Sequence, residues 1–222
     1  MRKSVAAMLL SFIAVYHPAV TAGQNQMIQR LEQKLYWQAS ERFELRGFLQ
    51  SRFQDMLSDF YYFNWDAGVS TYVNDRFKVP VCFRQTRREF GTDWQTTNYL
   101  LFDPTVLLVS AGGWQLDLRG RCTYMLTGTA VENIRLRPQA SYVFLRRNRE
   151  VGWYIYNDFY FQVLRQERLD HARFNLFAAG LRYPLNPVAG LDLRYMLFSA
   201  KYHQGAPWSH LHETCVVLEF RI

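Results

Sequence analysis

Trp114 to Leu126, which reads W-Q-L-D-L-R-G-R-C-T-Y-M-L, is the stretch of sequence that decides the fold. Its even-numbered positions hold Trp, Leu, Leu, Gly, Cys, Tyr and Leu, and its odd-numbered positions hold Gln, Asp, Arg, Arg, Thr and Met. Successive side chains of a β-strand point to opposite faces, so this period of two places an apolar face opposite a charged one. A helix would mix the two sets around its circumference. The stretch therefore predicts an amphipathic strand.

The same alternation recurs along most of the chain. In residues 133–145, apolar Ile134 and Leu136 alternate with Arg135 and Arg137. Comparable segments lie at 42–54, 76–88, 191–198 and from His212 to Ile222. Weaker candidates, whose facing is ambiguous, lie at 28–38, 60–73, 96–110, 151–164 and 171–184. Pro104 falls inside 96–110, and we expect it to bend or interrupt that strand because proline cannot donate to a strand ladder.

Short polar or Gly/Pro segments separate these runs. Val73-Asn74-Asp75, Gly112-Gly113, Arg147-Asn148-Arg149 and Asn186-Pro187 are typical of tight turns. Strands of about 10–14 residues joined by such turns indicate consecutive hairpins. The candidate strands number eleven, but a barrel with both termini in the periplasm has an even number, so we expect about ten or twelve. The predicted fold is all-β, a single antiparallel transmembrane β-barrel of about 10–12 strands.

The N-terminus predicts export. Arg2 and Lys3 precede an apolar run from Val5 to Val15, and Val20-Thr21-Ala22 presents small residues before Gly23. A basic start, a short apolar core and a small-residue exit are typical of a secretory signal peptide, and the alternative is a buried N-terminal helix. The run is too short to cross a bilayer as a helix, which needs about 20 residues. We therefore expect residues 1–22 to be a cleaved signal peptide and residues 23–222 to form one barrel domain.

Composition excludes several classes of protein. The net charge of +7 favours an anionic partner, and for an exported protein we expect lipid headgroups and no nucleic acid. The three cysteines form no complete disulfide framework, and their spacing does not match a zinc site, so we expect no metal and no cofactor. The mean hydropathy is −0.22 and no second apolar run reaches about 18 residues, which excludes membrane helices but leaves a membrane barrel open.

The charged face of the strands favours a membrane barrel over a soluble one. A soluble lipocalin-like barrel also alternates, but its apolar face points inward. Here arginines interleave with carboxylates, as they would if the two kinds of side chain paired with each other inside a lumen. Aromatic residues make up 17% of the chain, as in interfacial girdles, and the chain ends inside a strand at Ile222. The residues that we expect to line the lumen are Arg46, Arg84, Asp117, Arg119, Arg121, Arg135, Arg137, Asp158, Asp192 and Arg194.

Four stretches resemble a family of bacterial outer-membrane proteins. They are Ile134-Arg135-Leu136-Arg137-Pro138, Tyr156-Asn157-Asp158-Phe159, Ala179-Gly180-Leu181-Arg182-Tyr183 and the closing strand from His212 to Ile222. In order and spacing, about residues 30–222 are similar to the outer-membrane family catalogued as Domain of Unknown Function 2490. The resemblance implies an outer-membrane β-barrel and brings no known activity, ligand or catalytic residue. It also implies an acidic residue near Asp158 and an arginine shortly before the Ala-Gly pair, where this chain has Leu176.

Two functions stay open for such a barrel. One is a structural envelope protein, and the other is a narrow, porin-like pore that prefers anions because arginines line it. A barrel of this size falls between filled barrels of about eight strands and water-filled barrels of about sixteen. Whether arginine–carboxylate pairs close the lumen therefore distinguishes the two.

A lipid-modifying hydrolase is the enzymatic alternative. Ser209-His210-Leu211-His212-Glu213 precedes the last strand, His203 lies nearby, and a histidine can activate a serine hydroxyl. Adjacent residues of a strand point to opposite faces, however, so we assign no catalytic residue. A soluble periplasmic ligand-binding barrel is the remaining alternative.

The expected location is the outer membrane of a Gram-negative bacterium, with the protein as a monomer. Its expected partners are outer-membrane lipid and lipopolysaccharide. During assembly we also expect it to bind periplasmic chaperones and the barrel assembly machinery.

Overall fold

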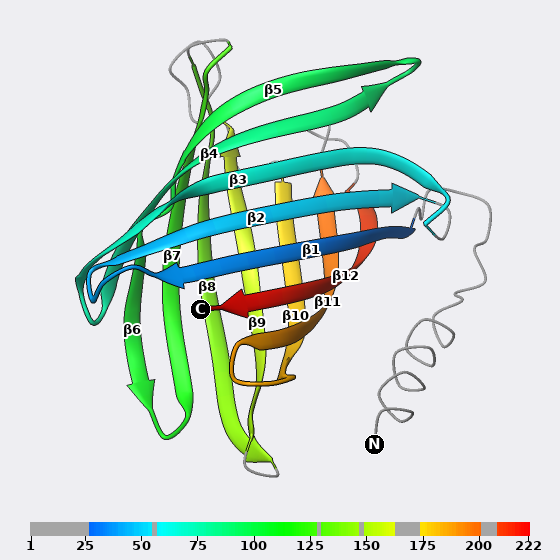
Figure 1. The fold of residues 1–222 in the computed structure, drawn as a ribbon. Coiled ribbons are helices and arrows are strands. Elements are labelled where there is room, and N and C mark those ends of the chain that lie inside the picture. The colour runs from blue at the N-terminus through cyan, green and yellow to red at the C-terminus, as the bar shows by residue number, and fades with distance from the viewer. Residues whose placement is uncertain (1–26, 55–56, 128–129, 147–148, 163–173, 201–207) are drawn as a thin grey trace.

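A computed structural model describes residues 27–54, 57–127, 130–146, 149–162, 174–200 and 208–222 of the chain (Figure 1). The expected signal peptide, residues 1–22, and His203 lie outside the described residues. In the ranges that are described, no helix is both long and apolar enough to cross a bilayer.

Each segment with the expected alternation forms a strand. The twelve strands of the described ranges are β1 (Met27–Gln38), β2 (Phe43–Gln54), β3 (Asp59–Asn74), β4 (Phe77–Phe90), β5 (Asp93–Phe102), β6 (Thr105–Ala111), β7 (Trp114–Met125), β8 (Ala130–Arg146), β9 (Arg149–Gln162), β10 (Phe174–Pro184), β11 (Ala189–Ala200) and β12 (Ser209–Arg221). The predicted all-β fold is therefore confirmed.

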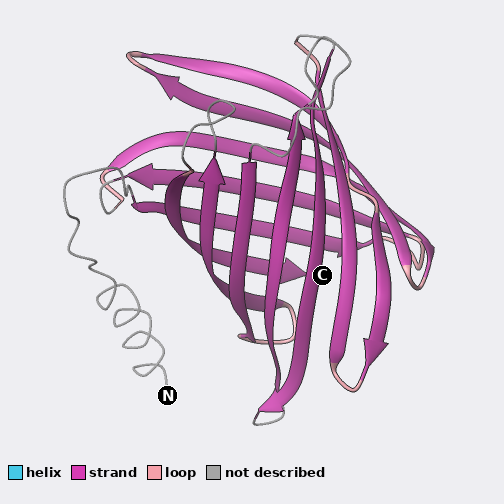
Figure 2. Ribbon diagram, turned by 180° about the vertical axis from the view of Figure 1, so that it is seen from behind, coloured by secondary structure: helices cyan, strands magenta, loops and turns pink. Residues whose placement is uncertain are grey.

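Eleven of these strands, counted over the described residues, close into a barrel. Pairing runs in chain order from β1 to β5, passes from β5 to β7, and continues in order to β12. The ring closes where β1 pairs in parallel with β12, and Figure 1 shows the two arrows pointing the same way. The other pairings within the described strands are antiparallel. Figure 2, from behind, shows the strands of the two walls crossing at a steep angle, as the tilt of a closed barrel requires.

The twelfth strand, β6, stands outside this ring. It pairs with β7 along its length and with β4 through two residues. Only Asp103-Pro104 separates it from β5, so the interruption expected within 96–110 is confirmed. The ladder persists around the break, because the amide of Asp103 donates to the carbonyl of Pro80 at 2.9 Å and that of Gly120 donates to Pro104 at 2.8 Å.

The ring of eleven strands confirms the predicted range of about 10–12, but the expectation of an even number is wrong. An odd ring brings its first and last strands together in parallel, and parallel ladders have evenly spaced, slanted hydrogen bonds that satisfy the backbone as antiparallel ones do. The seam continues to the end of the chain, where the amide of Ile222 donates to the carbonyl of Tyr36 at 2.9 Å. The amide of Gln38 in turn donates to the carbonyl of Ile222 at 3.0 Å.

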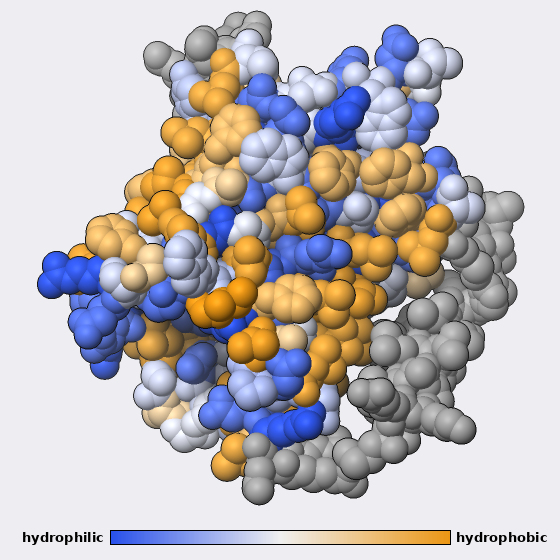
Figure 3. Space-filling view, in the orientation of Figure 1, coloured by the Kyte–Doolittle hydropathy of each residue, from blue (hydrophilic) through white to orange (hydrophobic). Residues whose placement is uncertain are grey.

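The outer face of the barrel is apolar. Leu31 and Leu35 of β1 and Leu45 and Leu49 of β2 are all exposed. Figure 3 shows apolar side chains over much of the wall that β1, β2, β3 and β12 form. The intervening residues of the same strands face the interior, so the period of two places its apolar set outside.

The interior wall has two parts of different character. Beneath β9–β12, the buried core consists of apolar and aromatic side chains, namely Tyr154, Tyr156, Leu176, Ala178, Met196, Cys215 and Val217. The inner faces of β1–β8 carry mainly charged and polar residues. All three cysteines lie on strands as free thiols, and Cys82 and Cys215 are buried. One side of the barrel is thus packed, and the other side carries the candidate site.

Candidate functional site

The interior of the barrel contains a cavity of about 1770 Å³. Among the described residues that line it, fourteen are arginine or lysine and seven are aspartate or glutamate. The expected lumen residues on its surface are Arg46, Arg84, Asp117, Arg119, Arg121, Arg135, Arg137, Asp158 and Arg194. The tenth, Asp192, is buried and pairs with Arg194 at 3.0 Å. The alternation of the strands therefore brings these side chains together inside the barrel.

Four arginines from two neighbouring strands form a group that we call the arginine cluster. Arg119 and Arg121 of β7 lie directly opposite Arg137 and Arg135 of β8. Like charges in directly opposed positions destabilise a sheet. The cluster therefore needs counter-charges from neighbouring strands.

Two buried aspartates supply these counter-charges. The carboxylate of Asp103, which lies in the break between β5 and β6, accepts hydrogen bonds from both Arg119 and Arg121. Asp158 of β9 accepts two hydrogen bonds of 2.6 Å from Nε and Nη2 of Arg137, and Arg135 lies 3.3 Å from the same carboxylate. Bidentate pairs of this kind are strong and hold the guanidinium plane in one orientation.

Aromatic rings support the β8 side of the cluster. The guanidinium carbon of Arg137 lies 3.9 Å from the ring centre of Tyr156, within the range of a cation–π contact. Nη1 of Arg135 donates to the hydroxyl of Tyr160 at 3.2 Å. Both rings belong to β9, so this strand presents one carboxylate and two aromatic faces to the arginines of β8.

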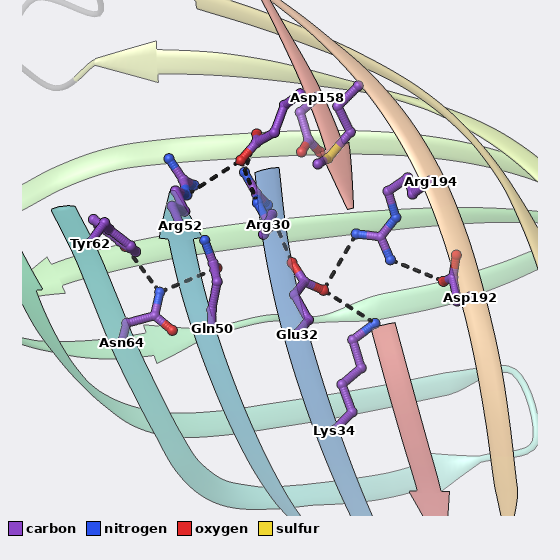
Figure 4. Close-up of polar contacts among 12 residues, drawn as sticks. Arg30, Glu32, Lys34, Gln50, Arg52, Tyr62, Asn64, Asp158, Asp192 and Arg194 are labelled. Carbon is purple, nitrogen blue, oxygen red and sulfur yellow. Dashed lines mark hydrogen bonds and ion pairs between the residues drawn. The ribbon is translucent and has the colours of Figure 1, made fainter. Parts of the chain in front are cut away.

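A second charged network spans the parallel seam between β1 and β12 (Figure 4). Nε of Arg30 donates to Glu213 at 2.7 Å, and the same arginine lies 3.3 Å from Glu32. Glu32 also lies 3.6 Å from Arg194 of β11, which pairs with Asp192. These side chains are buried, and they join three consecutive strands around the seam.

Tyr154 extends this network to β9. Its hydroxyl donates to the carboxylate of Asp192 at 2.7 Å and accepts from Nε of Arg194 at 2.7 Å. Gly180 on β10 makes room for the ring, because a Cβ at that position would meet the Tyr154 side chain. The glycine of the Ala-Gly pair is therefore explained by the position of this tyrosine.

Smaller polar contacts cover the β2–β4 wall. Arg84 and Asp66 form a bidentate pair, with both hydrogen bonds at 2.6 Å. Nδ2 of Asn64 donates to the hydroxyl of Tyr62 at 3.0 Å and to Gln50 at 3.3 Å, as Figure 4 also shows. Much of the wall is thus already hydrogen-bonded within itself.

Sequence reasoning missed several acidic and basic residues of the interior, among them Arg30, Glu32, Asp103 and Glu213. Arg30 and Glu32 lie in 28–38, where the facing is ambiguous. Glu213 lies in the strand predicted from His212 to Ile222, but it is not among the ten residues expected to line the lumen. Asp103 was hidden because it lies next to the strand-breaking Pro104. Arg30, Glu32 and Lys34 occupy alternate positions of one strand and all line the cavity. This alternation of charged residues could have identified Arg30 and Glu32 from the sequence.

The serine–histidine alternative is not supported by the contacts of its residues. The hydroxyl of Ser209 donates to the carbonyl of Ala200 at 3.2 Å. His210 instead lies 3.0 Å from the hydroxyl of Ser199, and His212 lies 2.5 Å from that of Tyr195. Over the described residues, no group of three or more His, Cys, Asp and Glu could hold a metal ion.

Leu176 occupies the position at which the family resemblance implies an arginine. Leu176 of β10 lies directly opposite Asp158 of β9. It belongs to the apolar core, and Asp158 takes its cations from β8 on its other side. The aspartate therefore keeps a counter-charge although its β10 neighbour is apolar.

Comparison with known proteins identifies one family. Residues 27–208 match the model of a family described as Protein of unknown function (DUF2490). No curated protein matches the chain. The family description assigns neither a location nor an activity.

Proposed function

Since the chain belongs to the DUF2490 family of proteins of unknown function, we propose its role from the barrel itself. The protein is an outer-membrane β-barrel whose narrow, arginine-lined interior admits small anions. The observation that carries this proposal is the inverted polarity of the wall, which is apolar outside and charged inside.

Inverted polarity favours a lipid environment. Monomeric soluble proteins rarely expose continuous apolar surface beyond a few hundred Å². In lipid the same surface is favourable, whereas a lysine or arginine facing the bilayer midplane costs about 2–4 kcal/mol. Leu100, Leu116, Ile134 and Leu136 are exposed on the wall that surrounds the arginine cluster. A soluble ligand-binding barrel would place such residues inside.

Aromatic clusters at both rims support the same location. Beside the β6–β7 and β8–β9 turns, the ring centre of Trp114 lies 4.9 Å from that of Tyr142 and 5.3 Å from that of Trp153. Near the β4–β5 turn, at the opposite rim, the rings of Phe60 and Trp94 lie 5.4 Å apart. Girdles of aromatic residues flank the apolar band of outer-membrane barrels.

The turns suggest an orientation. The β3–β4 and β6–β7 links are two residues long and lie at the rim where the chain ends. At the other rim, eleven residues separate the end of β9 from the start of β10, and eight residues separate β11 from β12. Outer-membrane barrels have short periplasmic turns and longer extracellular loops, so the rim with the C-terminus faces the periplasm in this proposal.

The charge of the cavity supports anion preference. Basic residues outnumber acidic residues two to one among those that line it. Rings of arginine and lysine favour anions in pores. A wall of low dielectric constant strengthens this field, because it focuses the potential into the lumen.

Single-channel recording tests the proposal. The purified, refolded protein is inserted into planar bilayers, and the reversal potential is measured under a potassium chloride gradient. We expect steady openings with anion preference, and a weaker preference when Arg121→Gln and Arg135→Gln are combined. Arg149→Gln is the control, because Arg149 is exposed and hydrogen-bonds to carbonyls of the β10–β11 turn at 3.2 Å.

The other outcomes separate the alternatives. A silent bilayer, with insertion shown by heat-modifiable gel migration, would contradict the pore and favour a structural envelope barrel. Failure to insert would contradict the membrane location and favour the soluble periplasmic barrel. A cation preference would refute the assigned role of the arginines.

A further inference from the structure

We propose that the arginine cluster is a binding site for one dianionic phosphoryl group. This inference rests on the proposed anion-selective interior and names the chemistry of the anion. The site consists of Arg119, Arg121, Arg135 and Arg137 on the cavity wall, with Asp103 and Asp158 beneath them.

The cluster has more hydrogen-bond donors than acceptors. Each guanidinium has five N–H donors, whereas each carboxylate offers about four lone pairs. Four guanidiniums share two carboxylates. Asp103 uses its oxygens for Arg119 and Arg121, and Asp158 uses its oxygens mainly for Arg137. Donors that remain on the cavity side are open to water and to the oxygens of a ligand.

One of these donors is buried and has no partner. Nε of Arg119 is inaccessible to solvent, and within the described part of the chain no group accepts a hydrogen bond from it. A buried donor without an acceptor lowers the stability of the folded state, because its desolvation is not compensated by a hydrogen bond. Arg119 reaches Asp103 through Nη2 alone, so its guanidinium is not held by the bidentate contact that Arg121 and Arg137 make. The Arg119 side chain is also the most exposed of the four, at 23%, so Arg119 is the arginine of the cluster most able to turn toward a ligand.

The charge of the cluster selects the ligand. Four arginines and two aspartates leave two positive charges uncompensated. A phosphate monoester carries a charge of about −1.5 to −2 at pH 7 and has three acceptor oxygens. Arginine forks bind such oxygens in pairs, so one phosphoryl group matches both the charge and the donor geometry. The cavity of about 1770 Å³ has room for inorganic phosphate or for a phosphorylated solute.

Equilibrium dialysis with radiolabelled inorganic phosphate tests the site on the refolded full-length barrel in detergent micelles at low salt. We expect saturable binding of one phosphate per barrel, with competition by sulfate but not by the same concentration of chloride. Competition by glycerol phosphate would assign the site to phosphorylated solutes, and its failure to compete would assign the site to free phosphate. Absence of saturable binding would overturn the proposal.

Arg119→Gln is the decisive variant. The loss of one charge-assisted contact is expected to weaken phosphate binding about tenfold. Arg88→Gln is the matched control, because Arg88 lines the same cavity on β4 and the change removes the same charge. Equal losses in the two variants would show that diffuse charge binds the anion, and would overturn the proposal. If Arg119→Gln does not refold, Arg119→Lys serves, since it keeps the charge and loses the fork.

The dialysis needs neither a bilayer nor a current. Phosphate binding together with a silent bilayer would support the site and contradict the pore. Anion currents without saturable phosphate binding would contradict the site and leave the pore supported.

Discussion

Gly68 shows how closely two strands approach inside the barrel. It lies on β3 opposite Cys82 of β4. A Cβ at this position would meet the carbonyl oxygen of Val81 and would lie 2.6 Å from Sγ of Cys82. Backbone atoms cannot turn aside as a flexible side chain can, so only a hydrogen atom fits here.

Gly68→Ala is expected to destabilise the barrel by about 1–3 kcal/mol, the usual range for an overpacked interior. Gly47→Ala is the control, because Gly47 also lies within a strand, and a Cβ there would have an ordinary contact of 3.7 Å with the Cβ of Leu35. The free energy of unfolding in urea, measured on refolded barrel in detergent, distinguishes the two variants. Equal stability of the two would contradict the close approach.

Parity predicts which side chains enter the lumen, but it does not predict their partners. Nine of the ten residues chosen by alternation line the cavity. Asp158, however, takes its cations from β8, whereas the family resemblance implied an arginine near the position of Leu176 on β10. Asp103 binds two arginines only because the break at Pro104 still leaves its carboxylate facing the interior. Such pairings depend on register between strands, which a single sequence does not reveal.

At the scale of the elements, the seam between β1 and β12 has a bidentate ion pair in a buried position. The side chains of Arg30 and Glu213 are 10% and 3% exposed. Removing one partner of a buried pair leaves an uncompensated charge, which costs more than the loss of an exposed pair. The same strand offers the comparison, since Glu219 pairs with Arg221, whose side chain is 65% exposed.

Glu213→Gln is therefore expected to destabilise the barrel by about 3 kcal/mol, and Glu219→Gln by about 1 kcal/mol or less. Both variants replace a glutamate of β12 by glutamine, so the difference between their stabilities reports the position of the glutamate and not the type of substitution. The temperature at which the folded, fast-migrating band is lost on a gel provides a direct measure. If this temperature falls further for Glu219→Gln than for Glu213→Gln, the buried ion pair at the seam does not hold the ring closed.

The strands themselves were more predictable than the ring they form. The eleven candidate segments cover the twelve strands of the described ranges, because the segment 96–110 contains both β5 and β6, which Pro104 separates. A wall with two unlike faces imposes a period of two, which is why alternation is informative. The ring of eleven strands lies within the predicted range of about 10–12, but its odd parity was not predicted, because the even count assumes that both termini lie at one rim. Here β1 begins at the rim opposite the one where β12 ends, and the parallel ladder joins them.

At the scale of the whole molecule, the interior has a packed part and a charged part that contains the cavity. The core beneath β9–β12 buries Tyr154, Met196 and Val217 almost completely, so this half is packed as the interior of a soluble domain is. The charged half has fewer apolar contacts and contains the cavity. We infer that the packed half fixes the position of β9, whose Asp158 pairs with two arginines of the cluster.

At the scale of the whole molecule, the last three residues extend the seam that closes the barrel. Phe220 lies opposite Leu35 of β1 and Ala189 of β11, and the amide and carbonyl of Ile222 both bond to the backbone of β1. Deleting Phe220 to Ile222 would expose strand edges at one end of the seam, and unpaired backbone groups in lipid cost several kcal/mol each. We therefore expect the truncated chain to fail to assemble into a heat-modifiable barrel.

Replacing the same three residues by alanine is the control, because it keeps the backbone pairing and removes the side chains. Assembly of the alanine variant would assign the defect to the open seam, and failure of both would assign it to recognition of the terminal side chains. A heat-modifiable barrel formed by the truncated chain would contradict the requirement for these residues altogether.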